Sequence, residues 1–390
     1  PRPFNILTEN TLAFGARSRL LGNANLFNKN LNWTIGGELF RDTYKFGTFE
    51  NLYQDFPAGS GSVKGNQLSK FKEKRTYYNL FLEVNYSFTE NTTLSVGLNY
   101  NKTQYTLKDK FVTQDDPDQS GSYDFDGMLS PKIGISHLLS ETTSIYANIS
   151  HGFSPPTTEE TLLPDGLINT SIKPETGWNF EIGSRAAWFD NRLQLNLAIY
   201  RLNVRNLLVA RRTGNDQFIG VNAGKTQHDG IELVLNYKLI DKKSFSLQSF
   251  TSYTLNNFRF KEFVDNDNNY TGNDLTGVPS DVFNTGIDFN TAIGLYGNIN
   301  FKQVGSIPIT DSNSLFTDSY NITNVKVGYR LNLNKNLKLN TFLGLNNIFD
   351  QKYASQILIN ASSFGGNAPR YYYPGNPINY FAGVNLNYTF

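Results

Sequence analysis

Side chains able to perform acid–base, nucleophilic or metal chemistry are scarce and widely spaced in this chain. It contains no cysteine, which excludes thiolate nucleophiles, thiolate metal ligands and disulfides. The histidines His137, His151 and His228 are far apart, and no G-x-S-x-G, P-loop or H-E-x-x-H motif occurs. We therefore expect no catalytic residue, no metal site and no cofactor in a protein that is not an enzyme.

Four glutamates stand out because their neighbours are apolar residues or glycine: Glu38 in IGGELF, Glu83 in FLEVN, Glu181 in NFEIG and Glu232 in GIELV. In an extended chain, successive side chains point to opposite faces, so each carboxylate projects away from an apolar face. Such a carboxylate must be hydrated or paired, because burial without a partner costs free energy. Simple hydration and pairing with a basic group both remain open.

The elements that position these carboxylates are strands with two different faces. Apolar or aromatic residues recur at every second position in about fifteen segments, without a convincing helical period. The clearest segments are 78–88, 94–100, 193–199, 231–237, 337–345 and 380–390. Short polar turns alternate with long loops, which are expected near 47–74, 109–126, 152–175, 212–225, 264–277, 309–318 and 351–377. This alternation is typical of outer-membrane β-barrels.

Composition agrees with a membrane-spanning sheet. The net charge of +1 gives no electrostatic argument for a nucleic-acid partner. No run of 18 apolar residues occurs, so a transmembrane helix is excluded. Lipid offers no hydrogen bonds, so a spanning sheet must close and present apolar side chains outward. The sequence predicts an all-β, transmembrane antiparallel β-barrel, with a soluble β-sandwich or propeller as the alternative.

The number of strands carries further information. An all-antiparallel barrel needs an even number of strands, whereas about fifteen are counted here. The start, PRPFN, is interpreted as a cut or processed end. We therefore expect residues 1–390 to be a single domain that forms the C-terminal part of a larger barrel.

Six segments carry further motifs: SIYANISHGFSPPTTEETL (144–162), KPETGWNFEIGSRAAWFDNRLQLNLAIYRLNVRNLL (173–208), NAGKTQHDGIELVLNY (222–237), GVPSDVFNTGIDF (277–289), NNIFDQKYAS (346–355) and YYYPGNPINYFAGVNLNYTF (371–390). These motifs resemble the barrel of TonB-dependent outer-membrane receptors, and they occur in family order between about 140 and 390. One departure is Ile378, where the family often has arginine in a P-R-N-Y run. The first 140 residues match only in pattern.

The resemblance implies an active importer of a scarce nutrient, most often a ferric siderophore, in the bacterial outer membrane. The family barrel has 22 strands, so seven strands and the plug domain would lie outside this chain. The implied partners are outer-membrane lipid, the plug domain, the TonB energy-coupling protein and a small ligand such as a ferric chelate. Glu181 and Glu232 match the glutamates that pair with plug arginines in the family, and Glu38 and Glu83 are candidates for the same role.

Other candidate contacts lie at strand ends and in loops. Arg370 with Tyr371, Tyr372 and Tyr373 suits an anionic iron chelate or a sugar, although aromatic packing at a loop tip explains the cluster equally well. His151, at the mouth of a loop, is a further candidate ligand contact.

Two more segments have candidate roles at the membrane. The resemblance makes the terminal residues Tyr388 and Phe390 part of the signal read by the barrel-insertion machinery; an interfacial aromatic without that role is the alternative. KFKEKR (70–75) is expected just outside a strand, where it would meet lipid phosphates or form a solvated charge run.

Two other functions compete with nutrient import. A passive porin-type channel of about sixteen strands would make this chain complete. A barrel anchor of a larger outer-membrane complex would use the same strands without transporting anything.

Overall fold

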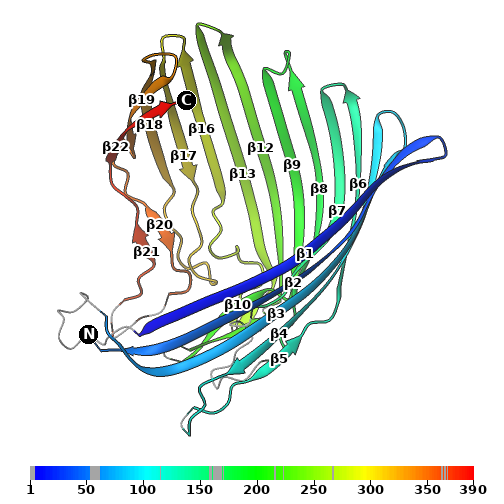
Figure 1. Ribbon diagram of the computed structural model, residues 1–390, viewed down its shortest axis with the longest axis vertical. Helices are drawn as coiled ribbons and strands as arrows, with labels where there is room; N and C mark the ends of the chain where they lie inside the picture. Colours follow the sequence, from blue (N-terminus) through cyan, green and yellow to red (C-terminus); the bar gives the residue numbers. More distant parts are fainter. Residues whose placement is uncertain are drawn as a thin grey trace. The chain divides into compact units, whose positions relative to one another are not determined.

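The computed structural model of the chain describes residues 5–52, 62–114, 116–157, 160, 169, 171–214, 217–222, 224–265, 268–361, 363, 366 and 368–390. Nearly all of the regular structure in these residues is β-strand (Figure 1). Within them, no helix has the length and apolar character needed to cross a membrane. The chain divides into two compact units, which are described separately. The prediction of a single domain therefore stays a prediction.

The first unit comprises Pro1–Gly134, Ser150–Trp178 and Val204–Ala223. Its long antiparallel strands pair in chain order, β1 with β2, β2 with β3 and β3 with β4, and β5 adds to β4. A separate hairpin joins β10 to β11. The bounds are β1 Ile6–Leu26, β2 Lys29–Asn51, β3 Lys64–Ser87, β4 Thr92–Asp109, β5 Gly121–Asp124, β10 Leu208–Gly214 and β11 Gln217–Asn222.

The second unit comprises Ile135–Ile149, Asn179–Asn203 and Gly224–Phe390. Its ladders from β12 to β22 are antiparallel. Four strands have residues in both units: β6 Met128–Ser140, β7 Thr143–Ser154, β8 Glu175–Trp188 and β9 Leu193–Arg205. The other bounds are β12 Lys225–Lys242, β13 Phe245–Glu262, β14 Val264–Asp265, β15 Asn268–Asn269, β16 Asp281–Thr291, β17 Leu295–Val304, β18 Tyr320–Asn332, β19 Leu337–Asn346, β20 Ala354–Ile357, β21 Tyr372–Pro374 and β22 Asn379–Tyr388.

The strand count predicted from periodicity is confirmed in the described residues. The large sheet has 16 strands, of which β5 lies off the main path, so fifteen follow one another along it. The two-stranded pairs β14–β15 and β20–β21 lie in segments predicted as long loops, and β10–β11 begins at Leu208, before the predicted loop at 212–225. The predicted loop at 47–74 is wrong over most of its length, because β2 continues to Asn51 and β3 begins at Lys64. Alternation continues there with charged side chains in place of apolar ones.

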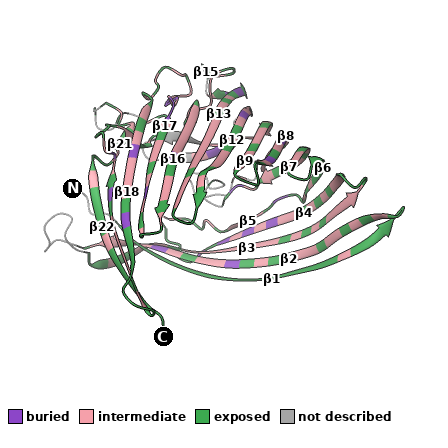
Figure 2. Ribbon diagram, turned by 90° about the horizontal axis from the view of Figure 1, so that it is seen from above, coloured by how far each residue is buried: buried purple, intermediate pink, exposed green. Residues whose placement is uncertain are grey.

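Each long strand has an apolar face and a polar face. In β3, Tyr78, Leu80 and Leu82 lie exposed on one face, whereas Glu83 lies on the other. Figure 2 shows this alternation of exposed and half-buried residues along the strands. Large exposed apolar side chains in such numbers are unfavourable in water and suit contact with lipid. We call the apolar faces of the long strands the apolar belt.

The belt ends where charged side chains replace apolar ones on the same face. In the second unit, Ile199 and Ile231 belong to the belt, and two residues further toward the long loops Arg201 pairs with Asp229 at 2.7 Å. The hydrogen bond from Arg201 is the main cause that lowers the pKa of Asp229. An ion pair on the outer face is costly in hydrocarbon, so the membrane-spanning part of these strands ends at Ile231.

Small cores form beyond the belt, on the long-loop side. In the first unit, Tyr105 of β4 packs edge-on against Phe125, which lies just after β5, and both are almost fully buried, as is Leu107 of β4. In the second unit, Phe260 packs against Phe263, with ring centroids 4.6 Å apart. Much of the tightly packed apolar structure therefore lies near the loops, whereas the apolar side chains of the belt are exposed and suit contact with lipid.

The belt generates a depth-dependent prediction. Leu82→Arg places a guanidinium in the middle of the belt of β3 and is expected to destabilise the protein folded in a bilayer by about 2–4 kcal/mol. Thr76→Arg, on the same face of β3 but beyond the belt, is the matched control, with an expected cost of about 0–1 kcal/mol. Equilibrium urea unfolding of the full-length protein from lipid vesicles measures both, and equal costs would contradict the lipid-facing assignment.

Candidate functional site: carboxylates on the polar face

Glu181 is held by a tyrosine from the neighbouring strand. The Tyr146 hydroxyl in β7 donates a hydrogen bond of 2.9 Å to Glu181 Oε1 in β8. Gly183 makes this possible, because a Cβ there would lie 2.5 Å from the Tyr146 ring and from the Leu197 carbonyl oxygen. The Arg185 guanidinium lies 5.3 Å from the Tyr146 ring centroid. Glycine therefore lets a tyrosine ring lie across β8 between a carboxylate and a cation.

Glu232 lies beside a second tyrosine-over-glycine contact, between β9 and β12. Tyr200 of β9 lies across Gly230 of β12, where a Cβ would come within 2.4 Å of the ring. Glu232 stands two residues from that glycine on the same face and is exposed. Among the described residues, no hydrogen bond reaches its carboxylate. The arrangement leaves the carboxylate exposed on the polar face, where a cationic partner could reach it.

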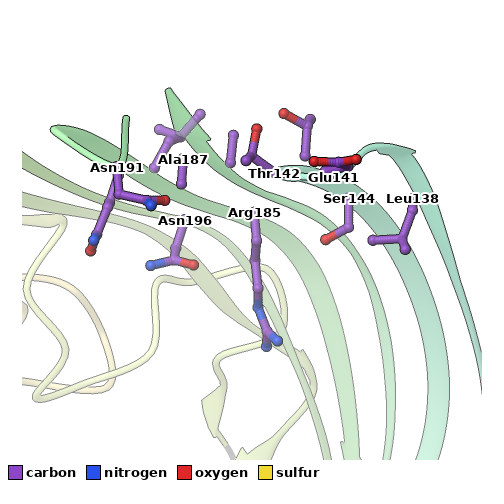
Figure 3. Close-up of a pocket in the computed structure, with 12 residues that line it drawn as sticks. Leu138, Glu141, Thr142, Ser144, Arg185, Ala187, Asn191 and Asn196 are labelled. Carbon is purple, nitrogen blue, oxygen red and sulfur yellow. The ribbon is translucent and has the colours of Figure 1, made fainter. Parts of the chain in front are cut away.

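Arg185 marks the short-turn end of this region. It lines an open recess together with residues of the turn after β6 and the start of β9. Figure 3 shows Arg185 extending from β8, with Asn196 and Ser144 on either side. The polar face of this unit thus carries Arg185 and Glu181 on β8 and Glu232 on β12. Charges of both signs are accessible there to a polar segment packed against the sheet.

The other two predicted carboxylates lie on the polar face of the first unit. Glu38 accepts a hydrogen bond of 2.9 Å from the Tyr77 hydroxyl and stands opposite Arg17 in the β1–β2 register. Glu83 is paired with Lys132 at 3.0 Å. A cation of this chain therefore already neutralises Glu83, whereas Glu38 has only a neutral donor among its hydrogen-bond partners in the described residues.

His228 lies on the polar face just beyond the belt edge at Ile231. Its Nε2 is 2.9 Å from Thr226 Oγ1, and its ring stacks on Phe258 with centroids 4.4 Å apart. Burial lowers the pKa of His228, and the negative charge of Asp229 opposes this only in part. The ring is therefore a neutral packing element near pH 7.

The remaining predicted residues lie at the surface. His151 shares the apolar face of β7 with Ile149 and packs on Trp178 at 5.1 Å, which favours an interfacial aromatic position over contact with an interior ligand. Tyr372 and Tyr373 are exposed in β21, and Tyr371 packs edge-on against Tyr372.

The chain terminus carries the two residues predicted to direct insertion. Phe390 is fully exposed and packs edge-on against Tyr388, with ring centroids 5.1 Å apart. Their predicted role as an insertion signal stays a prediction.

Sequence reasoning missed the tyrosines and one ion pair. Tyr146 and Tyr200 lie over glycines beside Glu181 and Glu232, and the only signal for them was a glycine two residues from each glutamate. Arg75 and Asp42 form a close pair at 2.6 Å on the polar face of the first unit, with the Asp42 side chain 12% exposed. The register that brings such pairs together cannot be read from one strand.

An apolar belt, antiparallel ladders and charged residues on the opposite face define a β-sheet of an outer-membrane barrel. The family model for the TonB dependent receptor-like β-barrel matches residues 2–348. The chain belongs to this family, and it is an outer-membrane protein.

Two curated relatives illustrate the similarity. The ferric-pyoverdine M114 receptor PbuA of Pseudomonas sp. (strain M114) is 25% identical over 268 residues, which cover 67% of this chain and 30% of the relative. The catecholate siderophore receptor Fiu of Escherichia coli K12 is 24% identical over 286 residues, which cover 71% of this chain and 34% of the relative. The alignments thus span about a third of these relatives.

Solved structures show the same fold. The siderophore receptor PiuA from Acinetobacter baumannii matches with a TM-score of 0.73 at 18% identity, covering 98% of this chain and 56% of that chain. At this identity the likeness concerns the fold alone.

The tyrosine-over-glycine contact generates a stability prediction. Gly183→Ala is expected to destabilise the folded protein by about 1–3 kcal/mol, because its methyl group meets both a ring and a backbone oxygen. Gly152→Ala is the control, since no atom would lie within 4 Å of a Cβ at that position. Urea midpoints of the full-length protein measure the difference, and a Gly183→Ala variant as stable as the control would refute the contact.

The buried histidine generates a pH prediction. The folded-state pKa of His228 lies below its ordinary value near 6.5, so the unfolded chain takes up the proton first as the pH falls. Stability is thus full above about pH 6.5 and decreases through the window down to the lower folded pKa.

His228→Phe is expected to reduce the loss of stability between pH 7.5 and 5.5, whereas His151→Phe keeps it. Urea unfolding at the two pH values tests this. An unchanged pH dependence in His228→Phe would show that another group is responsible.

Proposed function

We propose that the protein containing this chain imports a ferric siderophore across the outer membrane through a plugged β-barrel, with energy supplied by the TonB system. Membership of the receptor family supports this proposal. The names of the relatives support the ligand class, since they include ferric-pyoverdine and catecholate siderophore receptors. The chain itself contributes strands, loops and a charged polar face, and performs no chemistry.

The observation that carries the proposal is the pair of carboxylates on the polar face. Glu181 keeps one oxygen on Tyr146 and has only a long contact of 3.4 Å from Asn179 on the other. Glu232 is exposed beside Tyr200. Arginine guanidinium groups of a plug domain would bind both, because charge-assisted bonds to carboxylates are strong and directional. Glu38 is proposed as a further contact, and Glu83 would contribute through its pair with Lys132.

Ligand capture is proposed at the long-loop side. The β20–β21 hairpin presents exposed Tyr372 and Tyr373 close in sequence to exposed Arg370. Aromatic rings and a guanidinium suit the anionic, ring-containing surface of a ferric chelate.

An uptake experiment tests the function. Siderophore-deficient cells that express the full-length protein are given radioactive iron as a ferric catecholate or as ferric pyoverdine. The proposal predicts saturable uptake of at least one chelate that disappears without TonB or without a proton gradient. Uptake independent of TonB, with a steady open pore in planar bilayers, would identify a passive porin instead. A second protein that stably occupies the barrel interior, together with no uptake of either chelate, would indicate that the barrel anchors a larger outer-membrane complex.

The plug contact generates a separate prediction. Glu181→Gln combined with Glu232→Gln is expected to weaken plug docking in the full-length protein by about 1.5–3 kcal/mol for each charge-assisted bond lost. Plug release would then occur at lower urea concentration, and channel openings in planar bilayers would become more frequent. Glu90→Gln with Asp190→Asn, at short turns, is the control with the same charge change. Plug release and conductance equal to those of the control would exclude the two carboxylates as plug contacts.

A further inference from the structure

Lysines crowd one face of three neighbouring strands of the first unit. Lys45 of β2 stands opposite Lys72 of β3, which stands opposite Lys108 of β4, so three ammonium groups form one row. Lys74 adjoins the row along β3, and Lys110 follows Lys108 at the end of β4. We call these five residues the lysine patch. The strands that carry it lie side by side in Figure 2.

The patch continues the apolar belt on the same face. Lys72 and Lys74 follow Tyr78 at even positions of β3, so they share its face. The reverse face is closed at this level, because Tyr105 and Leu107 of β4 are 7% and 1% exposed. The lysine side chains therefore project outward above lipid-facing residues. The sequence-based expectation that 70–75 lies outside a strand is wrong, since β3 includes it.

The arrangement is unfavourable without an anionic partner. Like charges directly opposite one another in neighbouring strands repel. Repulsion from Lys74 is the largest cause that lowers the pKa of Lys72, and Lys45, Lys108 and Lys110 add to it.

Few acidic side chains lie on this face to offset the positive charge of the lysine patch. Asp124 of β5 faces the same side and is paired with Lys102 at 3.4 Å. In the described ranges, no ion pair or side-chain hydrogen bond involves a lysine of the patch. The patch therefore concentrates positive charge that is not neutralised by ion pairs within the described residues.

The height of the patch fits the headgroup region. Tyr78 and Tyr100 are the last aromatic residues of the belt on β3 and β4. Lys74 and Lys72 lie four and six residues beyond Tyr78. At about 3.3 Å per residue and a tilt of about 45°, this is about 9–14 Å above the aromatic level. Lysine side chains are long and flexible enough to reach back toward phosphates at the membrane surface.

We propose that the lysine patch binds the phosphate groups of lipid headgroups in the leaflet that surrounds the long-loop side of the barrel. Charge complementarity and continuity with the lipid-facing belt favour lipid over a soluble anion, because a headgroup phosphate is held at this height by its own acyl chains. The site fixes the barrel against anionic lipid and offsets the repulsion within the lysine row. It is independent of the identity of the imported ligand.

Lipid retention by the full-length protein tests the proposal. The protein in a nonionic detergent is mixed with bis-phosphorylated hexa-acylated lipid A, and bound lipid is counted by native mass spectrometry. The test variant is K45Q/K72Q/K108Q, and the control is K29Q/K335Q/K338Q, which removes the same charge near short turns. Dephosphorylated lipid A and millimolar inorganic phosphate serve as separate probes. Thermal unfolding in detergent alone reports whether each variant is folded.

The proposal predicts that K45Q/K72Q/K108Q is at least as heat-stable as the wild type in detergent and binds bis-phosphorylated lipid A at least about tenfold more weakly. The control variant binds like the wild type, and dephosphorylated lipid A binds equally weakly to all three. Equal binding of the phosphorylated lipid by the patch variant and the wild type would overturn the proposal. Displacement of that lipid by inorganic phosphate at millimolar concentration would overturn the assignment to lipid and indicate a site for free phosphate.

Discussion

Backbone hydrogen bonding in a solvent that offers no partners is the constraint on which the rest of this structure depends. In hydrocarbon, each N–H and C=O of a spanning segment must be satisfied by its neighbours, and antiparallel ladders achieve this strand by strand. The β12–β13 ladder, for example, runs from Lys225 opposite Glu262 to Lys242 opposite Phe245. Once the backbone is fixed as extended strands, side chains can only alternate between two faces, so one face meets lipid and the other meets water.

The polar face is organised by contacts between neighbouring strands. A tyrosine of one strand lies over a glycine of the next, two residues from a glutamate, in β7–β8 and again in β9–β12. In β7–β8 the Tyr146 hydroxyl also donates to Glu181, so a neutral donor orients that carboxylate, whereas Glu232 beside Tyr200 accepts no hydrogen bond among the described residues. Both Glu181 and Glu232 lie on the polar face of the sheet. A sheet built for lipid on one side can thereby present ionised groups on the other.

Much of the fold followed from the sequence because period two is a local property of each strand. It predicted fifteen strands and the face of Glu181 without any knowledge of neighbours. Tyr146 was missed because its contact depends on the register between two strands, which one strand does not encode. The length of β3 was underestimated because the apolar pattern stops at Tyr78 while the ladder continues through Lys72.

Loop packing could not be predicted from the sequence either, because polar residues in the loops form hydrogen bonds with residues far away in the chain. The Asp311 backbone N–H, for instance, donates to the Asn360 side chain at 3.0 Å.

The alternation of lipid and water along a strand is tested most directly by spin labels on single cysteines in the full-length protein in bilayers, at each position from 230 to 237 of β12. Oxygen should reach labels at Ile231, Leu233, Leu235 and Tyr237, and a water-soluble nickel complex should reach those between them. Collision rates without a period of two, or with both reagents favouring the same positions, would contradict the account.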